Sequence, residues 1–190
     1  MKIRNFFNHI KVVMKHKWVV FKLCCKIGIL WRGFMHDWSK FSPEEFWESV
    51  KYFDGHKSPI LFCREENGYS KAWLHHKGRN KHHFEYWIDT ALPEKASIMP
   101  YKYAAEMICD KLAAGIVYNG KNWTKDTQIN YYLNRERNIS IIHPQIDKFL
   151  IAVFTEVSKK WIDEVLTKNN IKKLYEKYCI RMENLDENKI

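Results

Sequence analysis

The sequence has few of the residues that interrupt helices, and few signs of strands or cross-links. It contains seven Gly and five Pro in 190 residues, and we find no strand-like alternation of apolar and polar residues. This scarcity favours helices. The five cysteines include no Cys-x-x-Cys pair, so neither a disulfide framework nor a zinc ribbon is indicated. Reduced thiols in a cytoplasmic protein are the simplest interpretation.

The sequence also lacks an apolar segment long enough to cross a membrane. The longest one, Trp18–Trp31, contains Lys22 and Lys26, whereas a spanning helix needs roughly 20 predominantly apolar residues. The first ten residues have no uninterrupted apolar run and no small-residue cleavage site, so we expect no signal peptide. The hydrophobic fraction of 46% is typical of a globular domain.

Acidic residues are fewer than basic residues in this chain. The chain has 22 Asp and Glu against 32 Lys and Arg, a formal net charge of +10. Such an excess raises the local concentration of anions, so phosphate compounds, nucleic acid and anionic lipid are natural partners. The basic residues are spread over the whole chain instead of forming one dense stripe, which argues against a protein that only binds nucleic acid.

Hydrophobic periodicity predicts a single all-α domain. The helices are expected at 4–27, 29–38, 42–55, 69–77, 81–88, 101–118, 125–136, 144–168 and 171–182, with an irregular connection at 54–68. Ser42-Pro43-Glu44-Glu45 predicts a helix start, in which Ser42 is the N-cap, Pro43 follows it and Glu45 completes a capping box. We expect the helices of about 4–120 to enclose a functional site. Helices of about 121–183 would pack against them, followed by a polar tail at 184–190.

Histidine is the most informative residue type in this chain. Seven of its nine copies fall between His16 and His83. The potential ligands are, in chain order, His16, His36-Asp37, His75-His76, His82-His83 and Asp110. Neutral imidazole and carboxylate bind Zn, Mn, Fe and similar divalent ions. Adjacent residues point about 100° apart on a regular helix, so His36 and Asp37 can share an ion only where a helix ends. The helix start at Ser42 requires such an end near Trp38–Phe41.

This order of residues resembles the HD-domain superfamily of metal-dependent phosphohydrolases. Its members carry a His on one helix, a His-Asp doublet at the end of the next, and a lone Asp on a later helix. The resemblance implies an HD-domain-like helical bundle with His16, His36, Asp37 and Asp110 around one ion. The run from His36 to Lys40 is similar to the His-Asp-x-x-Lys run of the two-metal branch, which contains the cyclic-dinucleotide phosphodiesterases.

The two-metal branch carries further histidines between the doublet and the final Asp. Here His75, His76, His82 and His83 occupy that interval. We expect two of them to be ligands, with His76 and His82 as the first choices and His75 and His83 as the second. The others would be outer hydrogen-bond donors or substrate contacts. The Gly-Tyr-Pro signature of the branch is absent, and the spacing from His76 to His82 is tighter than in the branch. The ligands of a second metal therefore stay open.

A second resemblance covers much of residues 10–120. The runs His36–Phe46 and Ala72–Trp87 are similar to a domain family of unknown function from bacteria and phages. That family brings no known activity.

Each candidate ligand also has a simpler interpretation. His9 is one heptad before His16 and is the alternative first ligand. His36 and Asp37 would otherwise cap a helix C-terminus, where the dipole favours His. Asp110 would otherwise pair with Lys111 or Arg79. The four middle histidines would otherwise belong to a solvated basic loop.

Other polar residues have weaker or purely structural interpretations. Lys40 either stabilises a departing phosphate or pairs with Glu44. Glu45 and Glu85 are alternative acids. His56 and His143 are interpreted as structural, with His143 capping the helix that begins at Pro144. Four tryptophans are expected in the core and not as base-stacking platforms: Trp38, Trp47, Trp73 and Trp87.

We interpret the chain as a hydrolase of a phosphate ester, with a nucleotide-type phosphomonoester or diester as substrate. One or two divalent ions are expected, and the sequence does not distinguish Mn, Fe, Zn, Co, Ni or Mg. The metal would activate a water as nucleophile, because the spacing suggests no activated Ser or Cys. Asp37 would hold the metal. Lys40, Arg79 and Lys81 would neutralise developing charge.

Two other functions remain open at this stage. Some relatives of the HD superfamily are di-iron oxygenases, which use the same ligand types. A basic nucleic-acid-binding or interaction protein without catalysis is the alternative of another class. It predicts steep salt dependence of binding and no loss of function when Asp37 is replaced.

Overall fold

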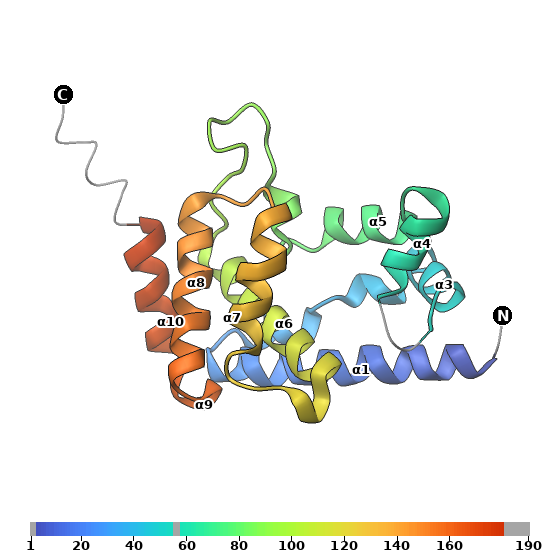
Figure 1. Cartoon of the computed structure of the whole chain (residues 1–190), viewed down its shortest axis with the longest axis horizontal. Coiled ribbons are helices and arrows are strands. Elements are labelled where there is room, and N and C mark those ends of the chain that lie inside the picture. The colour runs from blue at the N-terminus through green and yellow to red at the C-terminus, as the bar shows by residue number, and fades with distance from the viewer. Residues whose placement is uncertain (1–2, 55–57, 181–190) are drawn as a thin grey trace.

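The structure is a computed structural model that describes residues 3–54 and 58–180 (Figure 1). In these residues it contains α-helices, short 3-10 and π-helical segments and no strand. An isolated antiparallel bridge joins Ile88 and Ala96. The predicted all-α class is therefore confirmed. His56 and the predicted polar tail at 184–190 lie outside the described residues.

The helices are α1 (Ile3–Lys26), α2 (Leu30–Met35), α3 (Pro43–Lys51), α4 (Pro59–Asn67), α5 (Lys71–Arg79), α6 (Tyr101–Asn119), α7 (Thr127–Tyr131), α8 (Pro144–Lys159), α9 (Ile162–Val165) and α10 (Lys168–Tyr175). The 3-10 segments are Trp38–Phe41, Phe84–Trp87, Gly120–Asn122 and Arg137–Ile139, and the π-helical segments are Tyr132–Glu136 and Glu176–Ile180.

The apolar core lies where α6, α8 and α10 pack together and against the C-terminal half of α1. Figure 1 shows α8 and α10 at one end of the molecule and α3, α4 and α5 at the other, with α1 running along one edge. Representative core residues, all fully buried, are Val20, Ile108, Leu112, Phe149, Phe154 and Ile171. No helix in the described residues is long and apolar enough to cross a bilayer.

Several predicted boundaries differ from the structure for local reasons. The helix predicted at 29–38 ends at Met35, because Asp37 adopts a left-handed backbone conformation. The connection predicted at 54–68 contains a helix, α4. Its Pro and Gly are boundary residues, since Pro59 opens the helix and Gly68 closes it with a positive φ. The helix predicted at 144–168 stops at Lys159, after which Lys160 is extended.

The predicted start of α3 is confirmed, with one change. Ser42 is the N-cap and its hydroxyl accepts a hydrogen bond from the Glu45 backbone N–H (3.4 Å). The Glu45 side chain does not complete the capping box. It binds two histidines on α5 instead, His75 and His76.

A buried glycine sets how closely α2 approaches α1. A Cβ built on Gly33 would lie 2.6 Å from the Cys24 Cβ and 3.2 Å from the Phe21 Cα. We expect Gly33→Ala to lower the free energy of unfolding by about 1–3 kcal/mol, because the helices must separate to admit the methyl group.

Gly78 in α5 is the matched control, since a Cβ there meets nothing within 4 Å. Gly78→Ala is expected to raise the free energy of unfolding by roughly 0.5–1 kcal/mol. Urea unfolding followed by circular dichroism measures both changes. Equal effects of the two substitutions would rule out close helix packing at Gly33.

Candidate metal centre

The backbone reverses direction at the His-Asp doublet. His36 ends α2, and Asp37 has φ 50°, a left-handed conformation that Asp tolerates better than most residues. A 3-10 turn, Trp38–Phe41, follows directly. The Lys17 ammonium donates to the His36 carbonyl and so fixes this end of the helix. The helix end required by the sequence argument is present, and it lets adjacent side chains enter one cluster.

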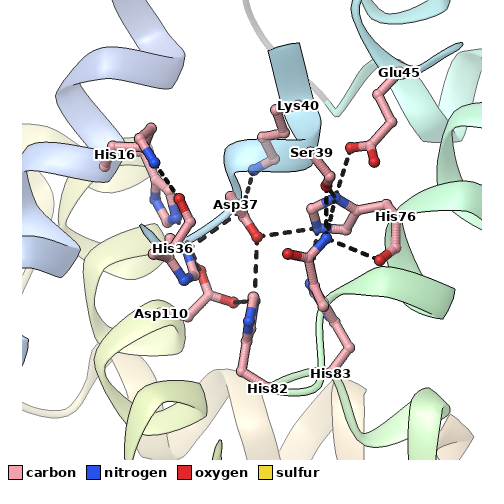
Figure 2. A network of polar contacts seen from close by, with 12 residues as sticks. His16, His36, Asp37, Ser39, Lys40, Glu45, His76, His82, His83 and Asp110 are labelled. Atoms are coloured by element: carbon pink, nitrogen blue, oxygen red, sulfur yellow. Dashed lines mark hydrogen bonds and ion pairs between the residues drawn. The ribbon is translucent and has the colours of Figure 1, made fainter. Parts of the chain in front are cut away.

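One half of the cluster joins α1, the doublet and α6. His16 Nε2 lies 2.9 Å from Asp110 Oδ1, although the two residues are 94 positions apart. His36 Nε2 lies 3.5 Å from the same oxygen and 3.3 Å from Asp37 Oδ2. The four residues that the sequence assigned to one ion therefore lie together, as Figure 2 shows.

The other half joins the doublet to α5 and the loop after it. His76 Nε2 and His82 Nε2 each lie 3.3 Å from Asp37 Oδ1. His83 Nε2 lies 2.9 Å from His76 Nε2. Asp37 Oδ1 thus faces two imidazoles of this half, while Oδ2 faces His36 of the other half, and Asp37 lies between the two halves (Figure 2).

The donor atoms fit a divalent ion. Among the described residues, three groups each place one nitrogen or oxygen per residue within 4.8 Å of one another. These groups are Asp37-His76-His82-His83, His16-His36-Asp37 and His36-His82-Asp110. His36 Nε2, Asp37 Oδ1 and His82 Nε2 are buried without a hydrogen-bond partner. Buried polar atoms are usually satisfied, so the inward-facing atoms lack a partner that a bound cation would supply.

Two outer carboxylates orient these imidazoles. The fully buried Glu106 of α6 accepts hydrogen bonds from His36 Nδ1 (3.0 Å) and from Arg32 Nε (2.7 Å). Its carboxylate also lies 3.4 Å from His82 Nδ1. Glu45 accepts from His76 Nδ1 (2.7 Å). A carboxylate on Nδ1 leaves Nε2 to face the cluster, which is the usual arrangement around metal-binding histidines.

Glu106 was missed by the sequence argument, and Glu45 had only an uncertain role there. A signal for Glu106 exists. It stands four residues before Asp110 in an otherwise apolar helix, so both carboxylates share one face of α6.

Burial opposes ionisation throughout the cluster, and mutual charges overcome it for the carboxylates. Burial raises the pKa of Asp37, but His36, Lys40 and His76 together hold it well below its usual range. His16 and His36 have the same net effect on the pKa of Asp110, which is partly buried. The pKa of Glu106 is lowered to about 2 against its burial, mainly by the hydrogen bond from His36 and by the nearby imidazole of His82. All three carboxylates are therefore charged at neutral pH, the form that binds cations.

The imidazoles respond in opposite directions. Burial lowers the pKa of His36, but the charge of Asp37 and hydrogen bonds to carboxylates raise it well above its usual value. Burial, followed by the neighbouring His82 and His76, lowers the pKa of His83 well below its usual value. Burial also lowers the pKa of His16, despite its contact with Asp110.

Lys40 and His9 differ from their alternative interpretations. Lys40 Nζ lies 2.7 Å from Asp37 Oδ2, so its ion pair is with the doublet and not with Glu44. His9 does not reach the cluster. It is buried with its ring against Phe46 and Phe53.

Several other side chains lie away from the centre. His75 faces Glu45 (2.6 Å) and not the cluster. Arg79 and Lys81 are exposed, with Lys81 over the Tyr86 ring, so the structure does not bring these predicted phosphate contacts to the cluster.

Asp110 pairs with neither Lys111 nor Arg79, because Lys111 binds Glu136. His143 caps α8 by accepting from the Gln145 N–H, as predicted.

A cavity of about 430 Å³ opens beside the cluster. Asp37, His76 and Asp110 lie in its wall together with the ammonium-bearing Lys15 and Lys40. The remaining wall is largely apolar and includes Val12, Phe53, Ile60, Val117 and Tyr118. A ligand in this cavity therefore meets the polar cluster on one side and apolar side chains on the other.

Comparison with known proteins gives one match. Residues 5–156 match the model of a family of unknown function (DUF5662). No curated protein and no solved structure matches the chain.

Proposed function

We propose that this chain, which belongs to the family of unknown function (DUF5662), is an HD-type metal-dependent hydrolase of phosphate esters. The observation that carries the proposal is the position of Asp37 between two groups of inward-facing histidines, with its Oδ1 buried and without a hydrogen-bond partner.

The ligand sets follow from which side chains surround each oxygen of Asp37. His16, His36 and Asp37 would hold one ion together with Asp110, which lies 2.9 Å from His16 Nε2 and 3.5 Å from His36 Nε2. Asp37 with His76, His82 and His83 would hold a second. Of the two second choices we keep His83 and not His75, because His75 faces Glu45. The first of these sets is the one that the resemblance to the HD-domain superfamily implies, and the second is our assignment from the contacts around Asp37. When bound, a divalent ion lowers the pKa of water to about 7 and polarises a phosphoryl oxygen.

The chain's own residues supply the rest of the reaction. Lys40 lies at the cavity wall beside Asp37, where its charge stabilises a phosphoryl group at the cluster. Glu106 and Glu45 keep the Nε2 atoms of His36 and His76 turned inward. The apolar wall suits the organic part of the ester and excludes water from it. A nucleotide-type phosphomonoester or diester is the substrate class we propose.

The test combines metal content with an activity panel. Protein purified without added metal or chelator is analysed for metal. It is then assayed on nucleotides, cyclic dinucleotides and a chromogenic phosphate ester with Mn, Co, Ni, Zn, Mg and Fe in turn. We expect bound divalent metal and hydrolysis of at least one ester. Iron-loaded protein that is silent across the panel and shows an optical band would instead favour the di-iron oxygenase. Metal-free protein that does not take up metal would contradict both.

A pair of histidines on α1 tests the ligand assignment. We expect His16→Ala to lower metal affinity by at least about tenfold, the minimum loss found for outer partners of metal ligands. His9→Ala also removes a buried imidazole from α1 and should leave metal affinity unchanged, because His9 contacts Phe46 and Phe53. Metal titration of the two variants gives the comparison. Equal losses would show that His16 acts through packing alone.

A further inference from the structure

The N-terminal part of the chain is basic because it lacks acids. Residues 1–36 contain eight Lys or Arg and no Asp or Glu, whereas the remaining residues are nearly balanced, with 24 basic and 22 acidic. Basic residues are indeed spread along the whole chain, but only this segment of sequence contains no acidic residue to balance them. Two of them pair with acids of later helices, Lys26 with Asp163 and Arg32 with Glu106. Most of the net charge of +10 therefore belongs to α1 and α2.

The outer face of α1 combines these lysines with exposed apolar side chains. Phe7, Met14 and Trp18 are spaced by seven and four residues, so they share one side of the helix. Phe7 is 63% and Trp18 59% exposed. Exposed lysines, Lys11, Lys15 and Lys22, run beside this stripe. The opposite side of α1 faces the metal cluster and the core through buried residues such as His16 and Val20.

A ladder of aromatic rings continues this surface on α2 and the following turn. The rings of Trp31, Phe34, Trp38 and Phe41 follow one another at centroid distances of 5.6, 6.4 and 5.7 Å. All four are exposed, Trp31 to 68%. The ladder adjoins α1, because the Lys17 ammonium lies 5.4 Å from the Trp38 ring centroid. Trp38 is therefore outside the core, contrary to the sequence prediction, and so is Trp47, which is 51% exposed.

We propose that the stripe on α1 and the ladder on α2 form a surface that binds anionic membranes. Tryptophan is enriched at membrane–water interfaces, and Phe, Met and Leu side chains insert among acyl chains. Helices that lie on membranes have an apolar face flanked by Lys and Arg. Each lysine near an anionic leaflet adds to the attraction. Because this surface has no acidic residue in α1 or α2, it complements negatively charged headgroups.

Two other occupants fit less well. A second copy of the chain would bring two uncompensated basic surfaces together, and like charges repel. A protein reads nucleic acid with Arg, Lys, Asn or Gln at base edges, or stacks bases on aromatic rings along a basic groove. The stripe and ladder instead mix their rings with exposed aliphatic side chains, Met14, Leu30 and Met35, which insert among acyl chains but do not stack on bases.

Flotation with lipid vesicles tests the proposal on the full-length protein. Vesicles of phosphatidylcholine alone are compared with vesicles that also contain phosphatidylglycerol. We expect binding only to the anionic vesicles and weaker binding as salt increases. Trp18→Ala combined with Trp31→Ala should lower vesicle affinity by at least about tenfold through loss of inserted area. Lys11→Gln combined with Lys22→Gln should lower it by about fivefold for each lysine.

Matched controls lie on other parts of the surface. Trp161→Ala removes a Trp that is 60% exposed near α9, and Lys121→Gln with Lys148→Gln removes two exposed lysines. Neither control should change vesicle binding.

Three results would overturn the proposal. These are equal losses in control and surface variants, self-association abolished by the tryptophan changes, and binding of DNA or RNA but not of vesicles. Asp37→Asn should still bind vesicles, so the outcome is independent of the proposed hydrolysis.

Discussion

Asp37→Asn is expected to abolish both metal binding and hydrolysis. The carboxylate faces both groups of histidines, with Oδ2 at 3.3 Å from His36 Nε2 and Oδ1 at 3.3 Å from His76 Nε2. Asparagine keeps the shape but loses the charge, and its amide nitrogen would face imidazole nitrogens. We expect affinity for either ion to fall by more than about a hundredfold, beyond the usual effect of removing an outer partner.

The measurements are metal content, metal titration and turnover of whichever ester the panel identifies. Asp89→Asn is the matched control, because it makes the same change at an exposed position away from the centre. A folded Asp37→Asn protein with full metal occupancy would place the metal elsewhere and remove the basis of the HD-type assignment. Circular dichroism of the variant establishes that it is folded.

Glu106→Ala is expected to have the largest effect on stability. Glu106 is buried and accepts hydrogen bonds from His36 and Arg32, and it faces His82. Removing it leaves the two buried imidazoles and the partly buried Arg32 around an empty space. Breaking a buried charged pair from one side costs about 3–5 kcal/mol, so we expect the free energy of unfolding to fall by that amount.

Glu106→Gln separates this structural effect from the role in the metal centre. Glutamine fills the space but is a weaker acceptor for His36 Nδ1, so metal affinity should fall by about 10–100-fold with a smaller loss of stability. Glu65→Ala, at an exposed position on α4, should change neither. Urea unfolding and metal titration are the readouts. Wild-type stability of Glu106→Ala would contradict the role assigned to this carboxylate.

The sequence was sufficient to find most of the cluster. His16, the His36-Asp37 doublet, His76, His82 and Asp110 converge as their order implied, because α1, the end of α2, α5 with its following loop, and α6 meet at one place. The helix start at Ser42 was equally informative, since it required the chain to turn just after the doublet. Whether these residues bind a metal remains the proposal tested above.

What the sequence missed depends on tertiary contacts. Glu106 meets His36 across 70 residues, and no local pattern specifies that pairing. Arg79 and Lys81 were placed at the site because they stand among the histidines in sequence. The chain leaves α5 at Arg79, where the Asn80 N–H bonds back to the His76 carbonyl, and both basic side chains remain exposed. Proximity in sequence was a poor guide where the backbone turned.

The contact between His16 and Asp110 also has a consequence for folding kinetics. It closes a loop of 94 residues between α1 and α6, and loop closure loses chain entropy before the contacts inside the loop can compensate. Neighbouring segments such as α7 and α8 pack across much shorter separations. The His/Asp cluster is therefore expected to assemble late in folding, after the helices that flank it in sequence have already formed.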